Sequence, residues 1–144
     1  MEANELMIGD WVGRVFDDKR IDYRQVDWMR TGEIGMRYQK VWAIGCIEPI
    51  PLTAEILVKN GFYDRNTQWY YKRFGSYVCF DIAISLIYRE IEVSKVCGAG
   101  TDCEEVEYGS SIIFGNDICV HNLQHVLRLC GLDELADNFK VYEK

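Results

Sequence analysis

The chain has 144 residues, a mass of 16.8 kDa and a formal net charge of −7. Hydrophobic residues make up 49% of it and charged residues 27%, which excludes a disordered or collagen-like chain. A protein that coats DNA or RNA needs a dense cationic surface, because phosphate contacts supply most of the affinity. Since acidic residues outnumber basic ones, we expect no polymeric nucleic acid as a partner.

Six cysteines occur, and none forms a Cys-x-x-Cys pair, so zinc-ribbon and thioredoxin-like sites are excluded. The N-terminus is acidic and lacks the apolar stretch of a secretion signal. No apolar run approaches the ~20 residues that cross a bilayer. We therefore expect a cytoplasmic protein with reduced thiols, no membrane partner and no cofactor.

The first 50 residues predict a small curved β-unit. Apolar residues predict a strand at Leu6–Val12, with a turn or bulge at Gly9-Asp10, and another at Val41–Ile47. Between them, residues 13–40 are polar and predict irregular chain. Short β-like pieces are expected there at Ile21–Tyr23 and Met36–Gln39.

Residues 51–144 predict an α+β unit that joins the first in one compact domain. Thr53 is a suitable N-cap for a helix at Ala54–Asn60, and Gly61 allows the left-handed stop. An antiparallel β-meander follows, in which Gln68–Phe74 and Tyr77–Ala83 flank a tight turn at Gly75-Ser76. Further strands are expected at Ile84–Val93, Cys103–Tyr108 and Ser111–Phe114. A packing helix near Val120–Cys130, ended by Gly131, and a helical turn at Asp133–Asn138 close the chain.

The final helix has one apolar and one polar arc. Val120, Leu123, Val126, Leu127 and Cys130 share the apolar arc, and His121, Gln124, His125 and Arg128 share the other. A guanidinium and two imidazoles suit phosphate or carboxylate oxygens; the alternative is a plain solvent face. His121 and His125 have the spacing of zinc ligands, but no Glu follows His121 and no third ligand is evident, so we expect no metal.

A second candidate surface is the strand around Trp69. Alternation places Trp69, Tyr71 and Arg73 on one face of it. A nucleobase can stack on such rings while the guanidinium meets a phosphate. The alternative is ordinary sheet packing. The sequence contains neither a glycine-rich phosphate loop nor a Gly-x-Ser-x-Gly elbow, so we do not expect an enzyme.

Three stretches carry a resemblance to known proteins. They are Glu5–Val12, then Ile47–Leu57 with Gly61-Phe62, and Val120–Gln124 running on to Gly131. Their order resembles a group of small proteins from phages, prophages and mobile elements of Bacteroides-like bacteria. The middle of the chain, residues 64–118, lies outside the resemblance, and His125 stands where that group usually has Asn.

This resemblance implies a phage counter-defence protein acting in the bacterial cytoplasm. Such a protein would be a sponge that binds a signalling nucleotide, cyclic ADP-ribose-like or a cyclic dinucleotide, without cleaving it. We expect a homo-oligomer whose ligand-binding residues are Trp69, Tyr71, Arg73, His121, His125 and Arg128. Two alternatives stay open, namely an acidic inhibitor that binds a host enzyme through Asp102–Glu107 and a nucleotide phosphodiesterase.

Overall fold

The computed structural model describes residues 5–30, 32–36, 40–64 and 68–141. The fold is mixed α+β and consists mostly of strands, as expected. The chain forms two units, Met1–Pro51 with Cys119–Lys144 and Leu52–Ile118. The division at Pro51 lies one residue from the expected one, whereas the C-terminal helices group with the N-terminal sheet.

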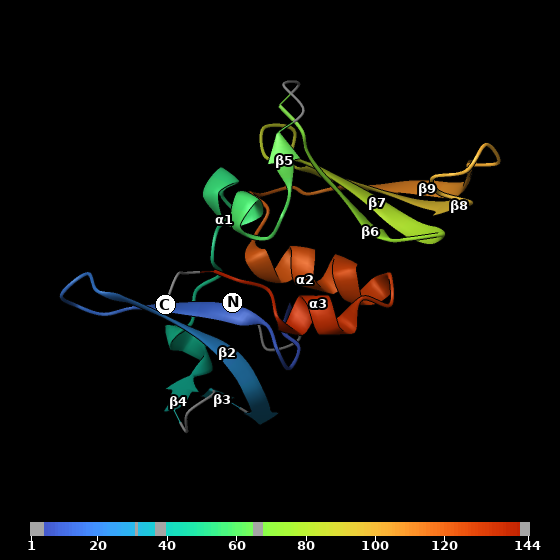
Figure 1. Ribbon diagram of the computed structural model, residues 1–144. Coiled ribbons are helices and arrows are strands. Elements are labelled where there is room, and N and C mark those ends of the chain that lie inside the picture. The colour runs from blue at the N-terminus through green and yellow to red at the C-terminus, as the bar shows by residue number, and fades with distance from the viewer. Residues whose placement is uncertain (1–4, 31, 37–39, 65–67, 142–144) are drawn as a thin grey trace. The chain divides into compact units, whose positions relative to one another are not determined.

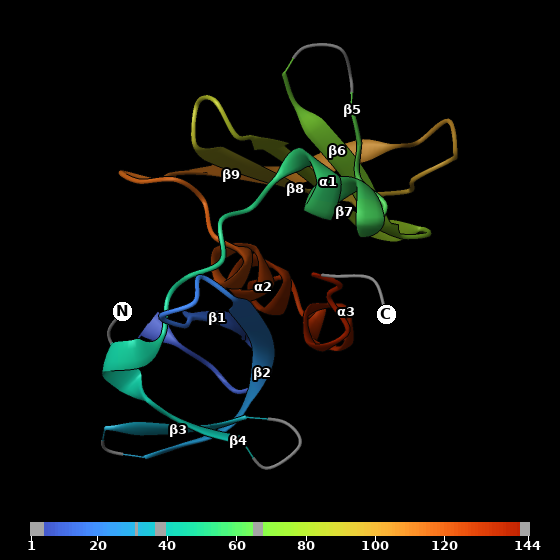
Figure 2. The same cartoon turned by 90° about the vertical axis from the view of Figure 1, so that its left-hand side faces the viewer.

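A curled antiparallel sheet dominates the first unit (Figure 2). Its strands, in spatial order, are β1 (Trp11–Val15), β2 (Ile21–Arg30), β3 (Glu33–Met36) and β4 (Lys40–Ala43). The ten-residue β2 pairs with β1 through its first half and with β3 through its second, and the register shifts between Val26 and Trp28. After the 3-10 helix η2 (Ile44–Cys46), two backbone hydrogen bonds join Glu48 to Gly13 of β1, so the sheet curls back on itself.

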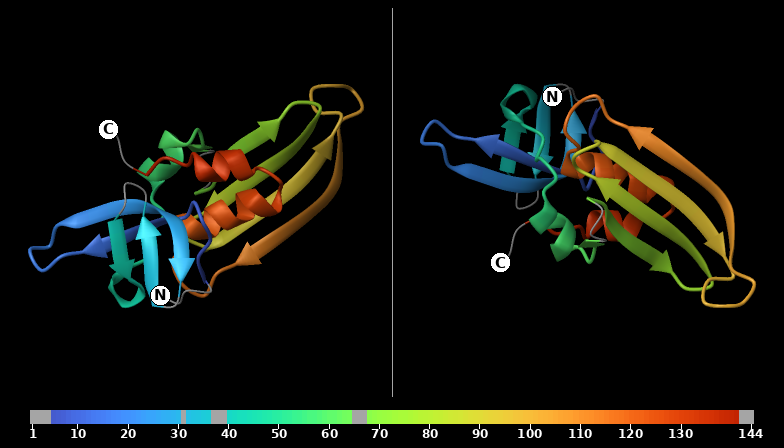
Figure 3. Two further views of the ribbon diagram at one scale, coloured as in Figure 1. Left: turned by 90° about the horizontal axis from the view of Figure 1, so that it is seen from below. Right: turned by 90° about the horizontal axis from the view of Figure 1, so that it is seen from above.

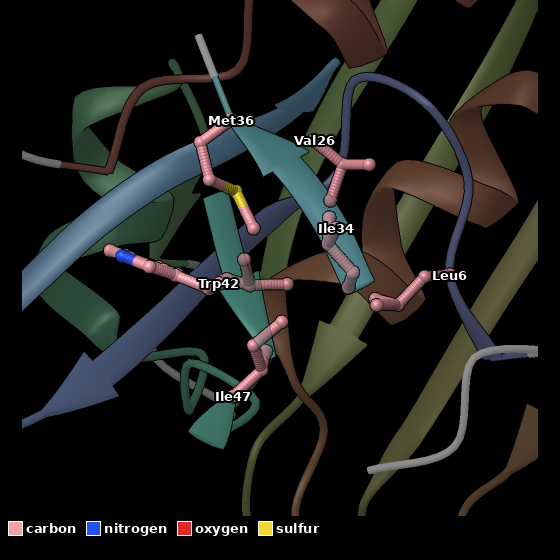
Figure 4. Close-up of a cluster of buried hydrophobic side chains, with 7 residues drawn as sticks. Leu6, Val26, Ile34, Met36, Trp42 and Ile47 are labelled. Carbon is pink, nitrogen blue, oxygen red and sulfur yellow. The ribbon is translucent and has the colours of Figure 1, made fainter. Parts of the chain in front are cut away.

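Seven buried side chains fill the inside of this curl: Leu6, Val12, Val26, Ile34, Met36, Trp42 and Ile47. Figure 4 shows the labelled side chains converging from β2, β3, β4 and the flanking segments, and Val12 comes from β1. Each is at most 5% exposed. Burial of such side chains contributes on the order of 1.5–3 kcal/mol apiece, so this cluster is the main stabilising element of the curl.

Several expectations for the N-terminal strands are wrong. The first strand begins at Trp11, because a turn around Gly9 precedes it. The polar stretch contains the long strand β2, which is stabilised by partners on both sides rather than by its own pattern. The last strand ends at Ala43, where η2 begins. Residues 37–39 of the piece expected at Met36–Gln39 lie outside the described residues.

The C-terminal helices of the first unit are α2 (Val120–Leu129) and α3 (Asp133–Asp137), shown in Figure 3. The amide of Val120 donates to the carbonyl of Ile50 at 2.8 Å, which ties the start of α2 to the N-terminal half of the same unit. Gly131, with φ +76°, ends α2 as predicted, because glycine tolerates left-handed backbone.

The second unit consists of one helix and a five-stranded antiparallel meander (Figure 1). Its elements are α1 (Ala54–Lys59), β5 (Tyr63–Asp64), β6 (Tyr70–Gly75), β7 (Val78–Ser85), β8 (Glu90–Cys97) and β9 (Glu105–Ile113). The prediction for α1 is confirmed, since the Thr53 hydroxyl accepts the amide of Ile56 at 3.2 Å. One face of the sheet buries Phe74, Ile82, Ile84 and Ile91.

Two strand expectations for this unit are corrected. The strand expected at Ile84–Val93 is interrupted, because β7 ends at Ser85 and a turn precedes β8. The two short strands expected between Cys103 and Phe114 form one long strand, β9, which pairs with β8 nearly residue by residue. Within the described residues, no helix combines the length and apolar character needed to cross a membrane.

Candidate functional site

The predicted polar arc of α2 surrounds a buried carboxylate. Asp10 is 0% exposed, and its carboxylate accepts the Met7 amide at 2.8 Å and the Arg128 guanidinium at 2.5 Å. His125 Nε2 lies 2.7 Å from the same carboxylate. Two of these partners, His125 and Arg128, lie more than 110 residues from Asp10 in the chain, so the arc joins α2 to the turn before β1.

Gln124 adds further hydrogen bonds between α2 and the segment Gly9–Trp11; we call these contacts, with those of Asp10, the joint. Its side-chain oxygen accepts the amide of Trp11 at 2.9 Å, and its amide nitrogen donates to the carbonyls of Gly9 and Ala136, both at 2.9 Å. Gln124 is fully buried and has its polar atoms hydrogen-bonded, as buried amides require. The polar arc is therefore an internal network of the first unit rather than a solvent face.

His121 is a second buried side chain of this arc. It is 6% exposed, and its ring packs edge to face on His125 with 5.6 Å between centroids. Burial lowers the pKa of His121 below its usual value, because the charged imidazolium loses its hydration. Its Nδ1 is buried and has no hydrogen-bond partner among the residues that the structure describes. Among the described residues, no group of three metal-ligating side chains gathers around it or elsewhere.

The second predicted set lies along β6 and the residue before it. Trp69 packs against Tyr88 at 6.4 Å between ring centroids, and Tyr71 packs edge to face on Tyr63 at 5.4 Å. All these rings keep part of their surface exposed. Tyr71 also lies beside Asp81, and burial together with that carboxylate raises the pKa of Tyr71.

Arg73 is held by two carboxylates. Its guanidinium donates to both oxygens of Asp81, at 2.7 and 2.9 Å, and to Glu104 at 2.9 Å. These hydrogen bonds raise the pKa of Arg73 and lower the pKa of Glu104. An arginine with two carboxylate partners has little unneutralised charge left for a phosphate.

The six predicted ligand-binding residues therefore fall into two sets. His121, His125 and Arg128 belong to the first unit, and Trp69, Tyr71 and Arg73 belong to the second. The structure brings the members of each set together. In both sets the arginine is already paired with carboxylates of its own unit.

The acidic segment Asp102–Glu107 is exposed at every residue. Two of its carboxylates are paired, Glu104 with Arg73 and Glu107 with Lys95 at 3.2 Å. Hydrogen bonds from Cys97 and Lys95 lower the pKa of Glu107. The segment thus presents less unpaired negative charge than its sequence indicates.

A hollow of about 320 Å³ lies at the end of the curled sheet, in the first unit. We call it the Arg14 hollow; it is lined by Arg14, Val15, Phe16, Asp17, Gly45, Cys46 and Glu48. These residues come from the end of β1, the turn that follows it, and η2 with the closing segment. The turn is fixed by reciprocal backbone hydrogen bonds between Phe16 and the segment Lys19-Arg20.

Phe16, one of the lining residues, has two arginines over its ring: Arg14, which also lines the hollow, and Arg20, which does not. The guanidinium of Arg14 lies 4.7 Å from the centroid of the Phe16 ring, and that of Arg20 lies 4.5 Å from it. Both distances are within the range of cation–π attraction. Within the described residues, neither guanidinium forms an ion pair, in contrast to Arg73 and Arg128. No periodic pattern predicts this site, because Arg14, Phe16 and Arg20 come together only through the β1–β2 turn.

Comparison with known proteins adds no relative: no protein-family model, no curated protein and no solved structure matches this chain.

Proposed function

We propose that this protein binds and holds a small phosphorylated compound with a flat ring, of the signalling-nucleotide class, without cleaving it. The Arg14 hollow is the site that supports this proposal best. The resemblance of three sequence stretches to small phage and prophage proteins points to the same class of function, counter-defence by sequestration.

The observation that carries the proposal is the pair of arginines on Phe16. Arginine meets phosphate through two parallel N–H···O bonds, and its planar face stacks on a base. The Phe16 ring restrains both guanidiniums before a ligand arrives, so less side-chain entropy is lost on binding. Because neither guanidinium has a carboxylate partner within the described chain, their charge is available to an anion.

The two carboxylates that line the hollow and its volume restrict which ligands can bind there. Asp17 and Glu48 would repel a bare phosphate, but carboxylates accept hydrogen bonds from sugar hydroxyls and base amino groups. A ligand with both a phosphate and such donors therefore fits better than inorganic phosphate. The volume of about 320 Å³ lies at the small end of the roughly 300–1,000 Å³ typical of ligand pockets, which favours a compound with one base over a cyclic dinucleotide.

The proposal is tested by incubating the purified protein with a panel of single-base and two-base signalling nucleotides. Bound material is separated from free ligand, released by heat and identified by chromatography and mass. We expect one single-base nucleotide to raise the melting temperature and to be released intact, while inorganic phosphate does neither. Release of an altered nucleotide would instead support the phosphodiesterase, and no binding at all would refute a nucleotide ligand.

Matched variants locate the site. Arg14→Gln and Phe16→Leu should each weaken binding at least about tenfold. The first removes a charged hydrogen bond to the ligand, and the second removes the ring that restrains the guanidinium. Arg30→Gln is the control, because Arg30 also lies over a ring, that of Trp28 at 5.1 Å, in the same unit. Trp69→Leu tests the strand predicted from sequence; loss of binding in that variant alone would move the site to the second unit.

A further inference from the structure

The edge strand β9 is unusual in its exposure. All nine residues from Glu105 to Ile113 are exposed, and β9 is the last strand of its sheet. Val106 is 61% exposed, Tyr108 52% and Ile113 74%. A long, exposed, apolar edge strand attracts another strand, and folded proteins normally shorten, charge or cover such an edge.

The hydrogen-bonding pattern shows which groups of β9 lack a partner. The amide of Phe114 donates to the carbonyl of Arg89 at 2.8 Å. In an antiparallel ladder the hydrogen-bonded pairs alternate, so Tyr108, Ser110 and Ile112 point their backbone groups toward β8. Those of Gly109, Ser111 and Ile113 point away from the sheet. The edge therefore offers a regular row of donors and acceptors to an incoming strand.

Charge and irregularity are confined to the N-terminal part of β9. Glu105 and Glu107 lie there, and the pairing with β8 shifts register between Lys95 and Val96. Bulges and charges are the devices that keep strands from pairing with an edge. From Tyr108 to Ile113 the strand is regular and carries no charged residue.

We propose that Tyr108–Ile113 is the interface through which two copies of this chain pair, antiparallel, about a twofold axis beside Ser111. In this register Gly109 lies opposite Ile113 of the partner subunit, and the outward backbone groups of both copies are satisfied at once. The antiparallel direction also keeps the two Glu105–Glu107 segments apart. A parallel arrangement would place them side by side.

Such pairing stops at two copies, because a twofold axis uses the β9 edge of both chains. The opposite edge of the sheet, whose described strand is β5 (Tyr63–Asp64), takes no part in it. Pairing through β9 thus closes as a dimer with one continuous sheet instead of growing into a fibre.

Two substitutions test the pairing without touching the β8–β9 hydrogen bonds. Ser111→Pro removes an outward N–H, and proline is tolerated in edge strands. Ile113→Lys places a charge at each end of the interface, opposite Gly109 of the partner subunit. The control is Leu129→Lys, which changes an even more exposed apolar residue (83%) in the other unit.

Mass is measured by light scattering and sedimentation at ~100 µM chain, a concentration at which interfaces of modest size associate. The wild type and Leu129→Lys should show twice the 16.8 kDa chain mass. The two β9 variants should show the mass of a single chain. A monomeric wild type, or a dimer that survives Ile113→Lys, would overturn the proposal.

Amide exchange followed by NMR provides a second readout that does not depend on a variant folding. In the dimer, the outward amides of Gly109, Ser111 and Ile113 should exchange as slowly as those of Ser110 and Ile112. On dilution to monomer, the outward amides alone should speed up, by at least about tenfold. Outward amides that exchange fast at high concentration would exclude β9 as an interface between copies of the chain. In a purified sample they would also exclude β9 as the interface with another protein.

Discussion

Replacing Asp10 by asparagine tests whether the polar arc of α2 is a structural joint. The Asp10 carboxylate is fully buried, and the Met7 amide and the Arg128 guanidinium both donate to it. In Asp10→Asn, whichever way the amide is oriented, its NH₂ group faces one of these donors. Removing one partner of a buried ion pair costs about 3–5 kcal/mol. Because Arg128 is 14% exposed and also reaches Asp137 at 3.3 Å, we expect the lower end, about 3 kcal/mol.

The measurement is urea unfolding at pH 7 followed by tryptophan fluorescence, which reports chiefly on the first unit because Trp11, Trp28 and Trp42 belong to it. Asp137→Asn is the matched control. Asp137 is 48% exposed and meets the same guanidinium, so its loss should cost at most about 1 kcal/mol. If Asp10→Asn lowers the free energy of unfolding by no more than Asp137→Asn does, the contacts of Asp10 with α2 do not hold the first unit together.

Two further stability predictions concern the same unit. Since burial lowers the pKa of His121 from 6.5, the unfolded chain takes up this proton first, and the free energy of unfolding should fall as the pH drops below about 6.5. His121→Gln should flatten that fall in a series of urea titrations, and an unchanged slope would assign it to another group. Gly9→Ala should cost about 2 kcal/mol, because Gly9 has φ +93° and an added Cβ would lie 2.5 Å from Asp137 Oδ1. Gly32→Ala, at φ +78° with no atom within 4 Å of the added Cβ, should cost about 1 kcal/mol; equal losses in thermal melts would contradict the packing argument.

Local signals were sufficient where neighbouring residues decide the structure. The helix α1 was predicted with its cap because Thr53, the apolar pair Ile56-Leu57 and Gly61 all act within one or two turns. The hairpin around Gly75 was predicted for the same reason, and Gly75 indeed has φ +107°.

Long-range pairing is what the sequence could not show. The strand β2 carries charges at Asp22, Arg24 and Asp27 and has no clear alternation, yet β1 and β3 together pair with both of its halves. The dipeptide Gly109-Ser110 resembles a break, but β8 pairs straight across it. In both strands the partner supplies the stabilisation that the local sequence lacks.

The same limit applies to the candidate sites. His125 and Arg128 looked available for a ligand because their partner, Asp10, is more than 110 residues away. Arg73 looked available because Glu104 is 31 residues away. Arg14 and Arg20 were missed for a different reason: residues 13–40 were expected to be irregular, so the turn that brings both arginines onto Phe16 was not predicted.

Amide NMR spectra recorded during nucleotide titration show directly whether a phosphorylated ring compound binds in the Arg14 hollow. Shifts should concentrate at residues 14–20 and 45–48, saturate with one ligand per chain, and require at least about tenfold more ligand in Arg14→Gln. Shifts that concentrate at residues 69–73 instead, or spectra that no nucleotide changes, would contradict the proposal.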